Sequence, residues 1–389
     1  MINKIKYLTE TIFDDVVSIR RYIHKNAELS FKEYETSAYI KSVLTSWKIP
    51  FTEDVADTGI VVLLKGNNPD LRTIALRADF DALPIIEEND IDYCSVNKGV
   101  MHACGHDAHT ASLLGVVKIL DALKKEWEGS VKFIFQPAEE MLPGGAQQMI
   151  KEGVLENPKV NKIIGQHVFP DLEVGKVGFC PGKYMASTDE LHITISGKGG
   201  HAALPAKYNN PLLAAAKLIT ELDESFRKEK DRPCVLAIGF IEGLGSTNVI
   251  PEQVKIKGTL RVMDENFRAI AHERMLTIAN DIAQGYNLDI DFNVRKGYPC
   301  LVNDVELTEK SISFAKEYMG VDNVIALPVR MTAEDFSYYS HKVPSCFYRL
   351  GTANKAKGIT HGLHTSRFNI DEDSLKAGMG LMAYLAIKN

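Results

Sequence analysis

The sequence lacks the features that would place the protein in a membrane or outside the cell. No stretch approaches the roughly 18 consecutive apolar residues of a membrane-spanning helix. The first residues contain no uninterrupted apolar core of the kind that a secretory signal requires. Only six of the 389 residues are cysteine, and they are too scattered for a disulfide framework. We therefore expect reduced thiols, a cytoplasmic location and no membrane partner.

An excess of positive charge is also lacking. The 45 basic side chains are outnumbered by 51 acidic ones, and the formal net charge is −6. A protein that binds the phosphate backbone of nucleic acids without regard to sequence needs a basic face, so we expect no nucleic-acid partner. The composition, with 45% hydrophobic and 25% charged residues, excludes intrinsic disorder. The length is typical of two or three domains.

Hydrophobic periodicity predicts alternating helices and strands in the first half of the chain. The predicted helices cover 5–19, 33–47 and 108–125, and the predicted strands cover 60–64, 73–76, 131–135 and 162–165. This alternation is typical of an α/β/α domain, in which helices pack on the faces of a sheet.

The pattern changes after Pro181 and returns after Pro299. Between them, alternating polar and apolar residues predict an antiparallel sheet with one solvent-exposed face, accompanied by two helices. The expected strands are 190–196, 235–241, 254–262 and 288–294, and the expected helices are 211–226 and 266–284. We therefore predict the α/β fold class: a split α/β/α domain, residues 1–183 and 295–389, with an α+β satellite domain inserted at 184–294.

The densest group of possible metal ligands lies at 102–109, where three histidines, a cysteine and an aspartate precede a predicted helix. Thiolate and imidazole are the usual ligands of zinc and similar divalent metals. Gly105 lets the backbone bend between Cys104 and His106, so that both side chains can face one ion. For this pair we favour a metal site over a histidine-rich loop. For His102 or His109 alone we favour the loop.

Two adjacent glutamates, Glu139 and Glu140, follow the apolar run 131–135. Neighbouring carboxylates at the end of a buried strand are costly unless a metal or a proton offsets their repulsion. A hydrolytic metal site needs one carboxylate as a ligand and another as a general base, and this pair can divide the two roles. By itself the pair is equally consistent with a solvated loop.

Further polar residues lie where predicted strands end. Asp79 and Asp81 follow the strand 73–76, and His167 ends the strand that begins at 162. Ligands of α/β sheets gather at the carboxyl ends of strands, which favours a shared site over isolated structural residues. The candidate metal ligands are Cys104, His106, one of the two glutamates, His167 and His364. Five ligands exceed the needs of one catalytic zinc and indicate a two-metal site.

The predicted satellite domain carries three candidates for substrate binding. His201 follows Gly199 and Gly200, which lack the spacing of a phosphate-binding loop and indicate a tight turn that presents the histidine. Asn248 and Arg261 lie at the ends of what we predict to be neighbouring strands. Arginine suits a planar carboxylate, which it can bind through two parallel hydrogen bonds. Each residue alone is also compatible with an ordinary turn, strand end or surface position.

Taken together, these segments strongly resemble a family of metal-dependent amidohydrolases. Its members include aminoacylases, hippurate hydrolases, N-acetyldiaminopimelate deacetylases and indoleacetyl-amino-acid hydrolases. The matching motifs, spread from His24 to Phe368, are His102–His109, Gln136–Glu140, Gly199–Ala202, Asn248–Pro251, Gly258–Arg261 and Glu334–Phe336.

The resemblance implies a dinuclear centre with Glu139 as the general base. Its ligands would be Cys104, His106, Glu140, His167 and His364. It also implies that His201, Asn248 and Arg261 bind the substrate carboxylate and stabilise the oxyanion. The two ions would be zinc, which thiolate favours, or manganese, nickel or cobalt, which cells load by availability.

The chain departs from the broader pattern at three positions. A His-x-Asp motif that supplies a ligand elsewhere reads Asp79-Phe80-Asp81, as in the cysteine-bearing branch. We therefore give Asp79 no ligand role and expect Asp81 to orient the neighbouring ligands. Ala27 and Ser366 replace usual prolines, away from the proposed chemistry.

The expected function is hydrolysis of the amide bond of a small N-acyl amino acid by a metal-bridged water. If the protein is an enzyme of another kind, the alternative is a dipeptidase or aminopeptidase. If it is not an enzyme, the alternative is a metal-binding dimer without turnover. Related enzymes dimerise through the satellite domain and place the equivalent of His201 in the neighbouring site. We therefore expect a homodimer of this kind.

Overall fold

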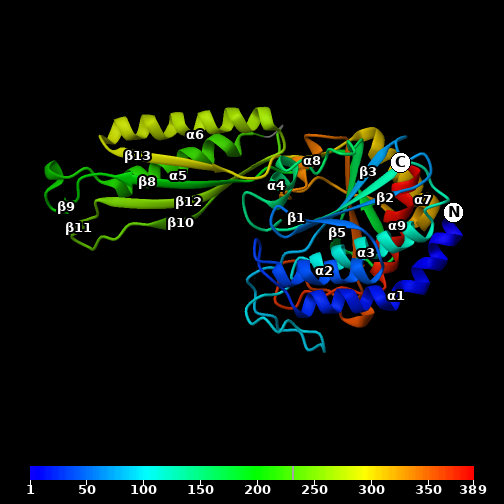
Figure 1. Cartoon of the computed structure of the whole chain (residues 1–389). Coiled ribbons are helices and arrows are strands. Elements are labelled where there is room, and N and C mark those ends of the chain that lie inside the picture. The colour runs from blue at the N-terminus through cyan, green and yellow to red at the C-terminus, as the bar shows by residue number, and fades with distance from the viewer. Residues whose placement is uncertain (230–231) are drawn as a thin grey trace. The chain divides into compact units, whose positions relative to one another are not determined.

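The computed structural model describes residues 1–229 and 232–389, which form two compact units (Figure 1). The first unit comprises Met1–Gly182, Val302–Pro328 and Asp335–Asn389. The second comprises Lys183–Leu301 and Val329–Glu334. Among the described residues, no helix has the length and apolar character needed to cross a membrane.

The first unit is built on a mixed eight-stranded sheet with the order β1-β2-β4-β3-β5-β16-β6-β15. Its strands are β1 (Phe51–Val55), β2 (Gly59–Lys65), β3 (Thr73–Asp79), β4 (Ser130–Gln136), β5 (Lys162–Glu173), β6 (Val177–Phe179), β15 (Val324–Ala326) and β16 (Ser345–Ala353). The central strands β4, β3, β5 and β16 are parallel to one another, so their carboxyl ends face the same edge.

The register of the central strands defines that edge. β3 and β4 end together, with Asp79 opposite Gln136. The pairing of β5 with β3 stops at Gly165, whereas its pairing with β16 continues through His167. The prediction that the strand ends at His167 was therefore wrong, because β16 extends β5 beyond the point where β3 stops.

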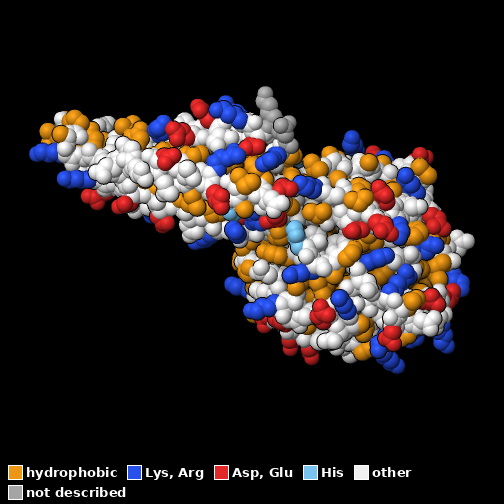
Figure 2. Space-filling view, turned by 90° about the horizontal axis from the view of Figure 1, so that it is seen from above, with side chains coloured by type: hydrophobic (Ala, Val, Ile, Leu, Met, Phe, Trp, Pro, Cys, Tyr) orange, Lys and Arg blue, Asp and Glu red, His pale blue; other side chains and the backbone are white. Residues whose placement is uncertain are grey.

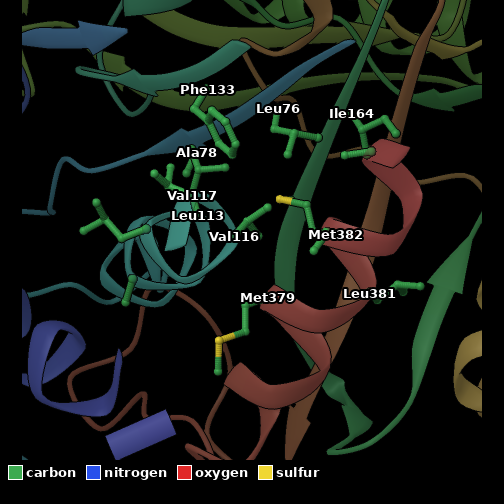
Figure 3. Packing of buried hydrophobic residues seen from close by; sticks show 14 of the residues in the cluster. Leu76, Ala78, Leu113, Val116, Val117, Phe133, Ile164, Met379, Leu381 and Met382 are labelled. Atoms are coloured by element: carbon green, nitrogen blue, oxygen red, sulfur yellow. The ribbon is translucent and has the colours of Figure 1, made fainter. Parts of the chain in front are cut away.

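The helices of the first unit pack a continuous apolar core against the sheet. They are α1 (Ile2–Lys25), α2 (Tyr34–Ser46), α3 (His106–Ala122), α4 (Gly145–Lys151), α7 (Val305–Met319), α8 (Ser337–Ser340) and α9 (Ser374–Lys388). Figure 3 shows Val116 of α3 and Met382 of α9 facing Leu76 of β3. Because α3 is buried along almost its whole length, its first residue, His106, is firmly placed.

The second unit contains a four-stranded antiparallel sheet with the order β10-β12-β8-β13. Its elements are β8 (Asp189–Ser196), α5 (Pro211–Arg227), β10 (Cys234–Glu242), β12 (Gln253–Val262), α6 (Glu265–Tyr286) and β13 (Asp289–Lys296). Along β8, Leu191, Ile193 and Ile195 are buried with residues of α5 and α6, whereas the residues between them are more exposed. A short ribbon of β9 (Gly200–His201) and β11 (Val249–Ile250) lies at one end of this unit (Figure 1). Two further short strands, β7 (Gly182–Met185) and β14 (Leu301–Asn303), pair with each other where the chain passes from one unit to the other. The predicted fold class, an α/β sheet domain with a smaller α+β part, is confirmed.

Candidate metal centre and active site

Cys104 and His106 flank Gly105, the residue directly before helix α3. Gly105 has a φ of 82°, a left-handed conformation that glycine adopts without strain. A Cβ at this position would lie 2.5 Å from Cγ2 of Val168 on β5. Glycine is therefore required twice, for the bend and for the close approach of β5, which carries His167.

Hydrogen bonds orient the rings of His106 and His167 and anchor the backbone of His364. Nδ1 of His106 donates toward the backbone oxygen of Asp81 at 3.0 Å and its Oδ1 at 3.1 Å. Nδ1 of His167 donates to the backbone oxygen of Val168 at 2.7 Å. The backbone N–H of His364 donates to Ala103 O at 2.8 Å, which anchors its loop. In both buried histidines Nε2 is left as the nitrogen that can bind a metal.

The candidate ligand atoms converge in groups that share Cys104. Its Sγ lies 3.4 Å from Nε2 of His167 and 3.3 Å from Nε2 of His364. Oε1 of Glu140 lies 3.3 Å from Nε2 of His364 and 3.9 Å from Nε2 of His106. Ligands at about 2.0–2.3 Å from a tetrahedral ion lie roughly 3.3–3.8 Å apart. Moreover, neither Nε2 of His106 nor Oε1 of Glu140, both buried, has a hydrogen-bond partner in the described part of the chain. The residues therefore fit a pair of divalent ions.

The charges around these atoms also suit cations. Burial raises the pKa of the Cys104 thiol well above its usual range, and nearby carboxylates raise it further. Burial opposes the charging of His106, but Asp79 and Asp81 raise its pKa to about 10. Burial, with Arg349 nearby, lowers the pKa of His167 well below its usual range. A divalent cation would offset the excess negative charge and hold Cys104 as thiolate.

Asp79 and His109 are also close to His106, but their ligand atoms have other partners. Nδ1 of His109 donates to Asp79 at 2.6 Å, and its Nε2 accepts the N–H of Val168 at 2.8 Å. Oδ2 of Asp79 accepts a hydrogen bond from Arg77 at 2.6 Å. This network supports the expectation that both residues are structural rather than metal ligands.

The two glutamates leave β4 on a turn that separates their side chains. Ala138 has a φ of 53°, in the left-handed region. Glu139 is buried, and its Oε1 accepts the backbone N–H of Asp335 at 3.4 Å. The backbone N–H of Glu140 donates to Oδ2 of Asp81 at 2.9 Å, while its carboxylate faces His364. One glutamate is thus directed to the ligand cluster and the other lies beside it, as separate ligand and base roles require.

Several residues that support the site were given no role in the sequence analysis. Asp335 accepts hydrogen bonds from Arg77 at 2.6 Å and Gln136 at 2.7 Å, beneath the two glutamates. Asp107, directly after His106, accepts hydrogen bonds from Arg20 at 2.7 Å and His24 at 2.8 Å. Their sequence signal is weaker: both aspartates lie inside matched motifs, His102–His109 and Glu334–Phe336, but residue type alone does not reveal their partners.

The candidates of the second unit fall into two places. His201 pairs with Val249 across the ribbon, and Ala202 N–H donates to Asn248 O at 3.0 Å, so His201 and Asn248 are neighbours. Arg261 lies eight residues beyond the start of β12, roughly 25 Å from that end of the strand. The strands expected at 235–241 and 254–262 are neighbours, as β10 and β12, whereas the short strand β11 after Asn248 pairs with β9. Within one chain, Arg261 is therefore not brought together with His201 and Asn248.

Because Sγ of Cys104 lies beside both His167 and His364, replacing this sulfur should disturb metal binding. Cys104→Ser should lose bound metal while the thermal unfolding temperature of the metal-free protein stays near that of the wild type. A hydroxyl is a far poorer ligand than a thiolate but fills nearly the same space. Metal content measured by mass spectrometry, and unfolding measured with and without chelator, test this. Normal metal content with full activity would remove Cys104 from the site.

Comparisons with known proteins identify the family of the chain. Residues 75–388 match the model of peptidase family M20/M25/M40. The chain is 36% identical over 375 residues to the N-acetylcysteine deacetylase of Bacillus subtilis, covering 96% of each chain. It is also 36% identical over 393 residues to thermostable carboxypeptidase 2 of Saccharolobus solfataricus, covering 100% of this chain and 98% of the relative.

A solved structure gives the same result. The Bacillus subtilis YXEP protein, described as a dinuclear metal-binding peptidase from the M20 family, matches with a TM-score of 0.83 and 33% identity over 97% of this chain and 98% of its own. The family model covers well over half of the chain, and full-length relatives exceed 30% identity. The chain therefore belongs to peptidase family M20/M25/M40 and is a metal-dependent hydrolase.

Proposed function

We propose that this hydrolase cleaves the amide bond of N-acyl amino acids. The observation that carries the proposal is that the guanidinium of Arg261 has no acidic partner among the described residues. Its guanidinium is partly buried, which lowers its pKa, and it donates only to the backbone oxygen of Met331, at 3.4 Å. Among the described residues no carboxylate lies within ion-pair distance of it. A guanidinium in this position suits the carboxylate of an amino-acid substrate. The N-acetylcysteine deacetylase relative, named for an N-acyl amino acid, supports this substrate class.

In the proposed reaction Cys104, His106, Glu140, His167 and His364 hold two divalent ions. When bound, the ions supply the positive charge that polarises the scissile carbonyl and lowers the pKa of water. Glu139 accepts the proton of the attacking water and returns it to the leaving amine. Asp335 holds the Glu139 carboxylate through its backbone N–H, and Asp81 keeps the ring of His106 oriented.

His201 and Asn248 are proposed to serve the site of a second copy of the chain. They lie too far along the unit from Arg261 for the same substrate carboxylate to reach both. Around the ribbon the apolar side chains Leu204, Leu244 and Val249 are 46%, 83% and 49% exposed. Figure 2 shows apolar side chains gathered at this end of the unit. We infer that the first unit is the catalytic domain and that the second, the satellite domain, forms a homodimer.

A substrate panel tests the proposal. Acetyl, benzoyl and indoleacetyl amino acids should be hydrolysed, and their amides, which lack the free carboxylate, should not. Arg261→Met should raise the KM for acyl amino acids without changing metal content. Preferred cleavage of dipeptides with a free α-amine would favour a dipeptidase or aminopeptidase. Bound metal with no hydrolysis of any substrate would favour the non-catalytic dimer.

A further inference from the structure

The turn that carries Glu139 is held in an unfavourable conformation at Ala138. A φ of 53° is rare for a residue with a Cβ. Two hydrogen bonds bracket this residue: its N–H donates to Oε1 of Glu33 at 2.8 Å, and its carbonyl accepts the N–H of Gly145 at 2.9 Å. A Cβ on Gly145 would lie 1.9 Å from Pro137 O, so this contact is available only to glycine. Such a conformation persists only where the surroundings impose it.

Glu33 has no evident use apart from this contact. It is fully buried, and its other oxygen accepts a hydrogen bond from Thr58 at 3.3 Å. No cation pairs with it in the described part of the chain, so its burial is costly. Accordingly, burial and the nearby Asp81 raise its pKa to about 7. Glu33 precedes helix α2 directly, yet its side chain does not cap the helix. Glu28 instead accepts the N–H of Thr36 at 2.8 Å in the first turn.

We propose that Glu33 is a positioning residue for hydrolysis. It fixes Ala138 in the left-handed turn, and thereby the directions in which Glu139 and Glu140 leave β4. Asp81 fixes the far side of the same turn through the N–H of Glu140. The inference rests on the proposed role of Glu139 as the general base. Helix α2 makes no use of the Glu33 side chain, whereas the strained turn has its only side-chain acceptor for the N–H of Ala138 there, among the described residues.

The decisive variant, Glu33→Leu, removes the oxygen that accepts the N–H of Ala138 and keeps a side chain of similar volume. With saturating metal, Glu33→Leu should lower kcat roughly 100-fold with little change in KM, because misplacement of a catalytic group by about 1 Å costs this much. Glu33→Gln keeps an acceptor oxygen and should stay within a few-fold of the wild type. Adding Ala138→Gly to Glu33→Leu should recover part of kcat, because glycine adopts this φ unaided.

Glu28→Gln is the matched control, since it perturbs a carboxylate that serves only α2. It should lower the unfolding temperature and leave kcat unchanged. If Glu33→Leu does not fold, Glu33→Asp replaces it, because a side chain shorter by one methylene withdraws from Ala138. Wild-type kcat in the folded variant, or no recovery from Ala138→Gly, would overturn the inference. Full activity of Glu139→Gln would instead overturn the assignment of the base. All variants are assayed on the substrate class that the wild type prefers.

Discussion

Glu139→Gln is expected to keep its metal ions and to lose turnover by about 10²–10⁴-fold, the usual contribution of general base catalysis. The amide has nearly the shape of the carboxylate, and it can still accept the hydrogen bond from Asp335 N–H. It cannot accept the proton of water. The measurements are kcat on the best substrate and metal content of the same sample.

Glu140→Gln provides the matched comparison, because it alters the adjacent residue of the same turn. Its carboxylate faces His364 and His106, so the neutral amide should weaken metal binding. Activity of Glu140→Gln should therefore recover as the metal concentration is raised, whereas activity of Glu139→Gln should not. The reverse pattern would exchange the roles of base and ligand.

Mixed dimers of two inactive variants are expected to regain roughly a quarter of wild-type activity. The variants are Glu139→Gln and His201→Ala, co-refolded in equal amounts. Random pairing makes half of the dimers mixed, and each mixed dimer has one site with an intact Glu139 and a partner with an intact His201. Activity after co-refolding, compared with each variant refolded alone, measures the recovery.

The physical basis of this expectation is the position of His201 on an exposed ribbon distant from Arg261 in its own chain. Formation of mixed dimers can be verified with two different affinity tags. Verified mixed dimers without recovered activity would show that His201 acts in its own subunit or not in catalysis.

Local features of the sequence predicted most of the fold. Apolar residues alternate with polar ones at Leu191, Ile193 and Ile195, and these three residues form the buried face of β8. The helical spacing of apolar residues before residue 20 likewise predicts the buried side of α1. The α/β class with a smaller α+β unit followed from such patterns. Strand ends were harder to predict: β5 extends past His167 because of its partner β16, which lies far away in sequence.

The candidate ligands could be named from residue type and motif, but their supports could not. Glu33 contacts Ala138 across 105 residues, and Arg77 contacts Asp335 across 258. Buried hydrogen bonds between such distant segments leave no periodic trace in the sequence. The separation of Arg261 from His201 within one chain likewise depends on which strands pair, and it is compatible with the expectation that His201 serves a neighbouring site.

The wide spacing of the ligands has a consequence for folding. Cys104 and His364 meet across 260 residues, Glu140 follows β4, and His167 lies on β5. The complete set of ligands comes together only in the folded chain, so the ions bind the folded protein more tightly than the unfolded chain. At a metal concentration of 100 times Kd, each ion would then add at most about 2.7 kcal/mol to the free energy of unfolding. Cellular metal supply would thus set not only how much enzyme is active but also how long each molecule escapes unfolding and degradation.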